Sequence, residues 1–307
     1  MIISVDFDPI LKKKYSFDKI DRRGVNTPLK TRYGAGGEGI ELAYLLNALN
    51  EQVKVCGCIG GINGTYIQHN LTQLKIPNSF IPIKDDTPES IILSSKDEEV
   101  IINSREQRIT REELNEFYDL YNRMVMQADM ICFIGKIPST VPKEIIYDFI
   151  ELAKKYDRQI LIRLSGEELR YSLDSQADLL LIDREDLEDI SKLKLNSIGE
   201  IIGASRYIMD RGVKHLVINL EDRGSLLIGQ DSYYRVKILS RIEDFETNPS
   251  YMLAGYALSL ARGYDIEMAA KLGQACGIGN SYIEEDIKDM GDIKYIMNEI
   301  EVKKYDY

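Results

Sequence analysis

The sequence contains no tryptophan and no long apolar run, and only two of its 307 residues are histidine. A membrane-crossing helix needs about 20 consecutive apolar residues, so we expect no membrane span. Cysteine is also scarce, and the four cysteines all lie inside apolar runs: Cys56, Cys58, Cys132 and Cys276. This placement predicts buried, reduced thiols. Cys56 and Cys58 lack the two-residue spacer of a zinc knuckle, and the histidines belong to unrelated segments, so we expect no zinc site.

Basic residues are in the minority, because 39 Lys and Arg face 50 Asp and Glu, for a formal net charge of −11. Nucleic acids and anionic membranes are bound by positive surfaces, so we expect neither as a partner. Residues 1–6 are apolar and end in an acid, without the Lys or Arg that precedes the apolar stretch of a secretory signal. We interpret them as the first strand and expect a cytoplasmic protein.

Short apolar runs recur along the chain, and most of them alternate with segments of helical periodicity. The runs are residues 2–5, 53–59, 130–134, 160–164, 179–182, 216–220 and 226–228. Strands that are apolar on both faces and separated by helices are typical of a parallel sheet covered on both sides. The sequence therefore predicts an α/β fold with a mostly parallel, doubly wound sheet flanked by helices. After Asn248 the pattern predicts helices alone.

Two polar segments, residues 12–32 and 87–104, interrupt this rhythm. Their patterns carry no helix signal, and the apolar residues 100–102 after a polar turn indicate a hairpin. We predict that both segments form one small β-sheet lid over the main domain. The single chain of residues 1–307 would then have a large α/β domain made of residues 1–11, 33–86 and 105–307.

Five motifs occur in an order that resembles the ribokinase/PfkB family of sugar kinases. They are a glycine-rich loop that opens a helix (residues 34–39), a GGxxG-like turn (59–64), a GSxPxGxP-like turn (135–142), an SGE strand end (164–167) and an AGY element (254–256). Within the family, the chain resembles the 1-phosphofructokinase and tagatose-6-phosphate kinase branch. The resemblance implies a ribokinase-like fold and the phosphorylation of a sugar or sugar phosphate by ATP with Mg²⁺.

The family's chemistry depends on a Gly-Ala-Gly-Asp loop at the start of a helix. Its backbone N–H groups form an anion hole for the transferred phosphoryl group, and its Asp takes the proton of the attacking hydroxyl. The matching residues here are Thr247, Asn248, Pro249 and Ser250. Ser250 cannot accept a proton as an Asp does, and Pro249 has no N–H to donate. We interpret Ser250 as the N-cap of the following helix.

The resemblance places the sugar pocket at Asp8, Lys12, Gly36, Gly37, Glu38 and Glu41. In this pocket Lys12 stands where the family has Asp, whereas Glu38 and Glu41 stand where it has Lys and Asn. Opposite charges that meet in a partly buried pocket offset each other's desolvation. We therefore predict that the Lys12 ammonium lies within about 4 Å of a carboxylate of Glu38 or Glu41 and that this pair closes the pocket. The alternative is that all three side chains point to solvent and leave an open cleft for another ligand.

The resemblance places the nucleotide side at Asp183, Asp186, Asn219, Glu221 and Gly224. Asp183 and Asp186 belong to the segment that matches the family's NxxE motif near Mg²⁺, and Asp186 is the candidate metal ligand. Glu221 replaces a glycine beside the phosphates, where a carboxylate repels a triphosphate. The family thus implies ATP and Mg²⁺ as cofactors, while Glu221 disfavours the nucleotide.

Three functions are compatible with these residues. The chain is an inactive sugar-kinase homologue that acts by binding or regulation, an active kinase on an atypical sugar or sugar phosphate, or a module that binds a metabolite. An active kinase would need another base, for which Asp244 and Glu246 are the candidates. Because family members often bury the lid against a second lid, we also expect a homodimer formed through the lid. A small sugar-like molecule is the candidate ligand.

Overall fold

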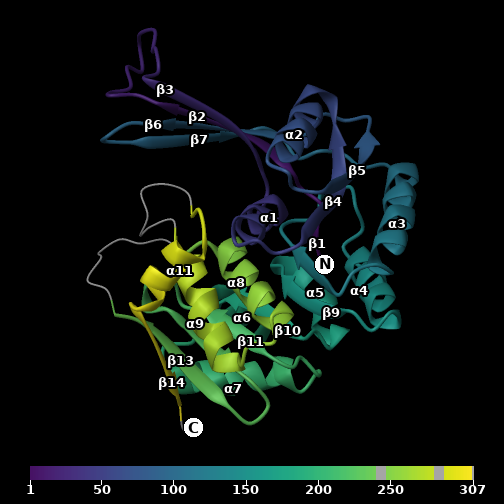
Figure 1. Cartoon of the computed structure of the whole chain (residues 1–307), viewed down its shortest axis with the longest axis vertical. Coiled ribbons are helices and arrows are strands. Elements are labelled where there is room, and N and C mark those ends of the chain that lie inside the picture. The colour runs from purple at the N-terminus through teal and green to yellow at the C-terminus, as the bar shows by residue number, and fades with distance from the viewer. Residues whose placement is uncertain (240–246, 280–286, 306–307) are drawn as a thin grey trace.

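The structure is a computed structural model that describes residues 1–239, 247–279 and 287–305. One large twisted sheet runs through the body of the molecule, with helices on both of its faces (Figure 1). A smaller sheet projects from one side of this body. Within the described residues, no helix combines the length and the apolar character needed to cross a membrane.

The strands at the centre of the large sheet are buried on both faces. In chain order the strands of this sheet are β1 (Ile2–Asp6), β4 (Val53–Gly60), β5 (Asn78–Ile83), β8 (Met130–Ile134), β9 (Gln159–Arg163), β10 (Leu179–Asp183), β11 (Leu216–Asn219), β12 (Ser225–Ile228), β13 (Tyr233–Ile238) and β14 (Ile300–Lys304). They lie side by side in the order β14-β13-β12-β11-β10-β9-β8-β1-β4-β5. Pairing is parallel from β5 to β11 and antiparallel from β11 to β14. Each apolar run that predicted a buried strand forms one, and the mostly parallel α/β architecture is confirmed.

Two groups of helices form separate apolar cores on the two faces of the sheet. One face is covered by α1 (Glu38–Ala48), α2 (Gly61–Gln73), α8 (Pro249–Ala261), α9 (Ile266–Gly277) and α11 (Met290–Met297). The other is covered by α3 (Arg111–Val125), α4 (Ile145–Lys155), α5 (Gly166–Ser172), α6 (Arg184–Ser191) and α7 (Ile198–Met209). Two short 3₁₀ turns, η1 (Leu173–Ser175) and η2 (Glu221–Arg223), complete the helical elements described. The four cysteines are buried and unpaired, as predicted.

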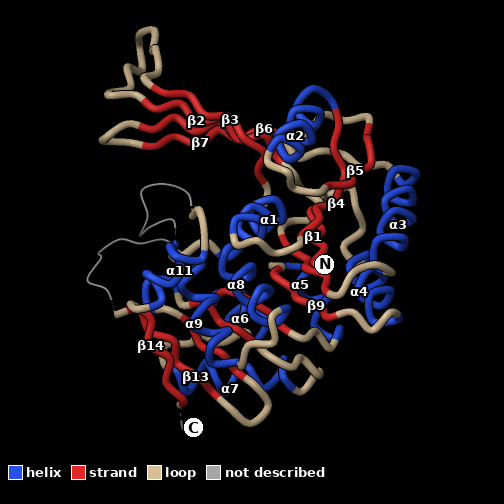
Figure 2. Tube along the Cα trace, in the orientation of Figure 1, coloured by secondary structure: helices blue, strands red, loops and turns tan. Residues whose placement is uncertain are grey.

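The small sheet joins two segments that are far apart in the sequence. It consists of β2 (Ile10–Ser16), β3 (Lys30–Gly36), β6 (Glu89–Ser94) and β7 (Glu99–Asn103), in the order β3-β2-β6-β7. Strand β2 pairs antiparallel with β3 and parallel with β6, so one sheet is formed from both predicted segments. The sheet stands off the helical body in Figure 2. We call it the lid; whether it is a domain in its own right stays a prediction.

The chain is not helical throughout after Asn248, and that prediction is wrong at its end. Strand β14 pairs antiparallel with β13 at the edge of the large sheet. The apolar residues Ile300 and Val302 alternate with charged ones, which is a strand pattern. This short pattern follows directly on α11, and its pairing partner β13 is remote in the sequence.

Helix α8 lies deep in one core, between α1 and α9. The contact with α9 depends on glycine, because a Cβ atom on Gly255 would lie 2.8 Å from the Cα of Gly273. Such close contact leaves α8 little freedom to shift along its axis. Its first residues are therefore held in a defined place beside α1.

Candidate functional site

Polar side chains gather where the central parallel strands end. Asp6 is the last residue of β1, Arg163 of β9, Asp183 of β10 and Asn219 of β11. The strand register aligns Asp6 with Ile134 and Ile134 with Arg163, and it pairs Asp183 with Asn219. These residues therefore form a row along the carboxyl edge of the sheet, which is where open α/β sheets bind their ligands.

Asp6, at the β1 end of this row, is fully buried. Its Oδ1 accepts a hydrogen bond from the N–H of Asp8 at 3.0 Å, and its Oδ2 accepts one from the N–H of Ile40 at 3.1 Å. The second bond caps α1, whose own N-cap, Gly37, has no side chain. Gly37 has a φ of 115°, and a Cβ there would lie 2.6 Å from Oδ2, so glycine is required. Burial raises the pKa of Asp6 to about 8 against the effect of both N–H donors.

A cavity of about 300 Å³ lies next to Asp6. It is lined by Asp6, Asp8, Ile10, Lys12, Gly37, Glu38, Glu41, Gly135 and Lys136. Gly36, the remaining pocket residue predicted from the sequence, lies against the Lys12 side chain, where a Cβ would be 2.7 Å from Cγ. Burial raises the pKa of Asp8 to about 6 and also raises the pKa of Glu38. Asp8 Oδ1 is buried without a hydrogen-bond partner, so the cavity wall carries an unsatisfied acceptor.

The predicted contact of Lys12 with a carboxylate is confirmed, and the carboxylate belongs to Glu41. Lys12 Nζ forms an ion pair with Glu41 Oε1, and Glu41 Oε2 accepts a hydrogen bond from Asn248 Nδ2 at 3.2 Å. One carboxylate thus joins the lid strand β2, helix α1 and the residue before α8. The pair does not close the pocket as we expected, because the 300 Å³ cavity remains on one side and a second of about 570 Å³ adjoins Lys12, Glu41 and Asn248 on the other. The aliphatic stem of Lys12 runs along Gly36, which leaves the space in front of Asp6 open.

The start of α8 is capped by Asn248, and the prediction of Ser250 as N-cap is wrong. Asn248 Oδ1 accepts hydrogen bonds from the N–H of Ser250 at 2.9 Å and of Tyr251 at 3.1 Å. Pro249 is the first helical residue, a position that suits its fixed φ and missing N–H. Ser250 therefore lies inside the first turn and is 1% exposed. Thr247, just before the cap, has a buried Oγ1 with no hydrogen-bond partner.

On the nucleotide side, the Asp183 carboxylate is held from two directions. Arg163 Nη2 lies 2.8 Å from Asp183 Oδ2, and Asn219 Nδ2 donates to Asp183 Oδ1 at 2.9 Å. Asp183 and Asn219 were predicted from the sequence, whereas Arg163 was missed. The available signal was a charged residue at the end of a buried strand, immediately before the SGE motif. The three side chains come from adjacent strands, β9, β10 and β11.

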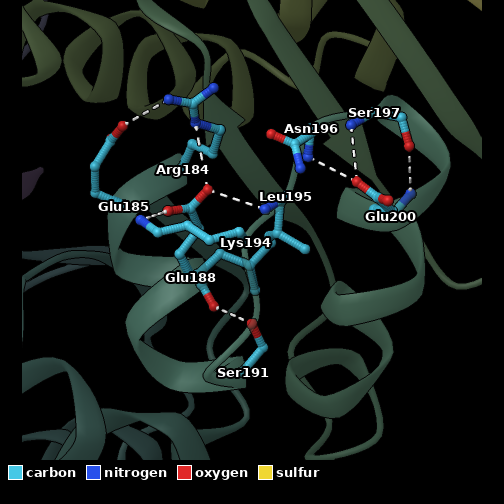
Figure 3. A network of polar contacts seen from close by, with 10 residues as sticks. Arg184, Glu185, Glu188, Ser191, Lys194, Leu195, Asn196, Ser197 and Glu200 are labelled. Carbon is cyan, nitrogen blue, oxygen red and sulfur yellow. Dashed lines mark hydrogen bonds and ion pairs between the residues drawn. The ribbon is translucent and has the colours of Figure 1, made fainter.

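The polar residues that begin α6 are also engaged within the protein. Asp186 Oδ2 accepts a hydrogen bond from the N–H of Asp183 at 3.2 Å, in a capping box with Asp183 as N-cap. Burial raises the pKa of Asp186. Arg184 pairs with Glu185 at 3.1 Å and approaches Glu188 at 4.0 Å (Figure 3). The polar side chains at the start of α6 therefore bind groups of α6 and its N-cap.

In the loop after β11, Glu221 adopts a backbone conformation that is typical of glycine. Glu221 has a φ of 54°, a left-handed conformation that is unfavourable for a residue with a side chain. Its N–H donates to Asn219 Oδ1 at 3.2 Å. Three residues later, Gly224 has a φ of 81°, and a Cβ there would lie 2.3 Å from the carbonyl oxygen of Val236. The strained Glu221 and the obligatory Gly224 together form the turn between β11 and β12.

The candidate bases Asp244 and Glu246 lie outside the described residues. Within residues 1–239, 247–279 and 287–305, no group of three or more His, Cys, Asp or Glu side chains could hold a metal ion. Both oxygens of Asp183 and one oxygen of Asp186 already accept protein hydrogen bonds. These carboxylates fit a Mg²⁺ ion poorly, because they offer few free lone pairs to its near-octahedral geometry and the Arg163 guanidinium beside them would repel it.

The parallel sheet with a lid at its carboxyl edge, and a helix that starts beside the pocket, define the fold of a sugar kinase. The profile described as "pfkB family carbohydrate kinase" matches residues 10–278, and the chain belongs to this family. Members of the family use ATP, generally with Mg²⁺.

The individual relatives are similar over almost their whole length. The chain is 25% identical to a 1-phosphofructokinase of Borreliella burgdorferi, with 99% of this chain and 98% of that protein covered. It is 23% identical to a 1-phosphofructokinase of Bacillus subtilis, with 93% and 94% covered. Among solved structures, phosphofructokinase-2 of Escherichia coli in complex with fructose-6-phosphate superimposes with a TM-score of 0.86 at 18% identity, over 97% of this chain and 98% of that one. This last likeness confirms the ribokinase-like fold.

The raised pKa of Asp6 predicts a pH-dependent stability. Its carboxyl keeps a proton in the folded protein up to about pH 8, whereas the unfolded chain releases it near pH 3.8. The free energy of unfolding is therefore expected to fall as the pH rises between these values and to level off above them, with a slope of at most about 1.4 kcal/mol per pH unit. Asp6→Asn is expected to remove this contribution in urea denaturation across the range. The control is Asp97→Asn at an exposed position, and parallel pH curves for Asp6→Asn and the wild type would contradict the prediction.

The Lys12–Glu41 ion pair is expected to contribute to stability more than an exposed pair on the same strand. A double-mutant cycle of Lys12→Met and Glu41→Gln in urea denaturation is expected to give a coupling of about 1 kcal/mol. The matched control is Lys14 with Glu99, whose atoms lie 3.4 Å apart with both side chains about half exposed. Its coupling is expected to be near zero because water screens it. Equal coupling free energies for the two pairs would show that the burial of Glu41 does not strengthen its ion pair with Lys12.

Proposed function

We propose that the protein is a PfkB-type homologue of 1-phosphofructokinase that has lost phosphoryl transfer and acts as a binding or regulatory protein. The observation that carries this proposal is the start of α8. In an active member, free N–H groups at this helix terminus would meet the transferred phosphoryl group. Here the N–H groups of Ser250 and Tyr251 are bound by Asn248, and Pro249 has none.

The residue at the position of the catalytic base supports the same proposal. Ser250 is buried, and a serine hydroxyl needs an activating base before it can take part in proton transfer. The two histidines of the chain, His69 within α2 and His215 directly before β11, belong to elements other than α8.

The charges on the sugar side also support the proposal that the protein no longer binds a phosphorylated sugar. Phosphate recognition relies on Arg and Lys. In the 300 Å³ cavity, however, the Lys12 ammonium is paired with Glu41, and Lys136 lies 3.6 Å from Glu106. Asp8 and Glu38 add two carboxyl groups. A phosphosugar placed there would meet lysines that are already paired with carboxylates.

A second candidate function, the binding of a metabolite without turnover, is favoured by the cavity that persists beside Asp6. A thermal-shift screen with ATP, ADP and sugar phosphates tests it, because a ligand of the native state raises the melting temperature. An active kinase with an atypical sugar is the third possibility, and its candidate bases, Asp244 and Glu246, lie outside the described residues.

We expect no phosphorylation of fructose 1-phosphate, fructose 6-phosphate or tagatose 6-phosphate at rates typical of kinases, roughly 1–100 per second. Loss of the base costs roughly 10² to 10⁴ in rate, and loss of an anion-hole donor roughly 10² to 10³. A coupled assay of ADP release measures this, with the Bacillus subtilis 1-phosphofructokinase as positive control. Ser250→Asp alone is expected to stay at background because Asn248 still holds the N–H groups. Turnover by the wild type at the rate of the control would refute the proposal.

We further propose that the protein forms a homodimer through the lid. The edge strand β7 exposes Val100, Ile101 and Ile102, with Ile101 at 56% and Ile102 at 51% exposure. Exposed apolar side chains on a sheet edge favour pairing with another surface. One solved relative, phosphofructokinase-2 of Escherichia coli, has a form described as tetrameric.

In sedimentation velocity at micromolar concentration, the wild type is expected to behave as a dimer and Ile101→Lys as a monomer. A charge at the centre of the apolar strand would be desolvated in the interface. The matched control is Ile62→Lys, which changes an exposed isoleucine of α2 outside the lid and is expected to leave the dimer intact. A monomeric wild type would refute the lid-mediated dimer.

A further inference from the structure

We propose that the guanidinium of Arg163 is a built-in counter-ion that stands in place of a divalent cation between the sugar and nucleotide sides of the site. The protein would then fold and bind its ligands without Mg²⁺. This inference rests on the proposed function, because it explains how the site keeps its charge balance after phosphoryl transfer is lost.

The position of Arg163 is fixed by the fold. It ends β9, its side chain is 11% exposed, and its Nη2 lies 2.8 Å from Asp183 Oδ2. Asn219 holds the other oxygen of the same carboxylate. An arginine held by a neighbouring strand and largely removed from water cannot leave without exposing Asp183 as an unpaired charge.

One carboxylate contacts this guanidinium, and two more feel its charge. Asp183 binds it directly. Burial raises the pKa of Glu38 on α1 and of Asp186 on α6, and the positive charge of Arg163 opposes this rise at both groups. Glu38 lines the sugar-side cavity, and Asp186 belongs to the segment that resembles the nucleotide-side motif. A single positive charge thus lies between the two halves of the site, as a bound divalent cation would.

The same contacts disfavour the ion itself. A divalent cation at Asp183 and Asp186 would have to share their oxygens with Arg163, Asn219 and the backbone N–H of Asp183. It would also be repelled by the adjacent guanidinium. Arg163 Nε is buried without an acceptor, so Asp183 is the carboxylate that binds the guanidinium directly. Metal and arginine are therefore alternatives at this position.

The test compares the thermal unfolding of wild type and variants in MgCl₂, CaCl₂ or MnCl₂ with that in KCl of equal ionic strength. The wild type is expected to show the same melting temperature in all of them. Arg163→Met is expected to melt lower in KCl with EDTA and to regain about 2–4 °C in millimolar divalent salt, since a bound ion stabilises the native state. The control is Arg158→Met, at the other end of β9, where the guanidinium binds the carbonyls of Val125 and Met126. This variant is expected to show no response to divalent ions.

Two results would overturn the inference: a rise in the wild-type melting temperature that is specific to divalent ions, or an Arg163→Met protein that ignores them. If Arg163→Met does not fold, titration of the wild type with Mn²⁺ followed by electron paramagnetic resonance decides, and stoichiometric binding refutes the proposal. The outcome is separable from the proposed function. An inactive protein that binds Mn²⁺ contradicts the role of Arg163 alone, whereas kinase turnover contradicts the proposed loss of activity.

Discussion

The carboxylate of Glu41 connects the parts of the molecule that a sugar kinase must move and align. It binds the ammonium of Lys12 on the lid strand β2 and the amide of Asn248 before α8, while it is itself fixed in the first turn of α1. Asn248, oriented in this way, presents its oxygen to the N–H groups that begin α8. The position of the lid and the state of the helix terminus therefore depend on one acidic side chain.

The polar residues keep their places at the strand ends, and several of them form ion pairs with one another. The carboxyl ends of β1, β9, β10 and β11 still meet at one edge, and a cavity remains beside Asp6. The charges at this edge, however, are largely directed at one another, with Lys12 facing Glu41 and Arg163 facing Asp183. In the proposed function, internal pairs of this kind take the place of the interactions that a bound phosphate would provide.

Local pattern was sufficient to predict the central strands and the lid, and the family resemblance added the contact between Lys12 and a carboxylate. The strands are short apolar runs with clear boundaries, and Lys12 and Glu41 lie in two motifs whose convergence the family resemblance implies. The N-cap of α8 was predicted wrongly because Asn248 and Ser250 are both good capping residues. Asn248 is the N-cap because Pro249 occupies the first helical position and because the distant Glu41 binds the Asn248 amide. Arg163 and β14 were missed for a related reason, since their roles depend on neighbours, Asp183 and β13, that are distant in sequence.

The double engagement of Asn248 has a consequence for local unfolding. Its amide donates to Glu41 on α1 while its carbonyl oxygen accepts from the first turn of α8, so a movement of α1 away from α8 would also release the side chain that caps this turn. Bonds that break in the same local opening form one cooperative unit. Amide protons at Ser250 and Tyr251 would then exchange with solvent on the timescale at which α1 and α8 separate.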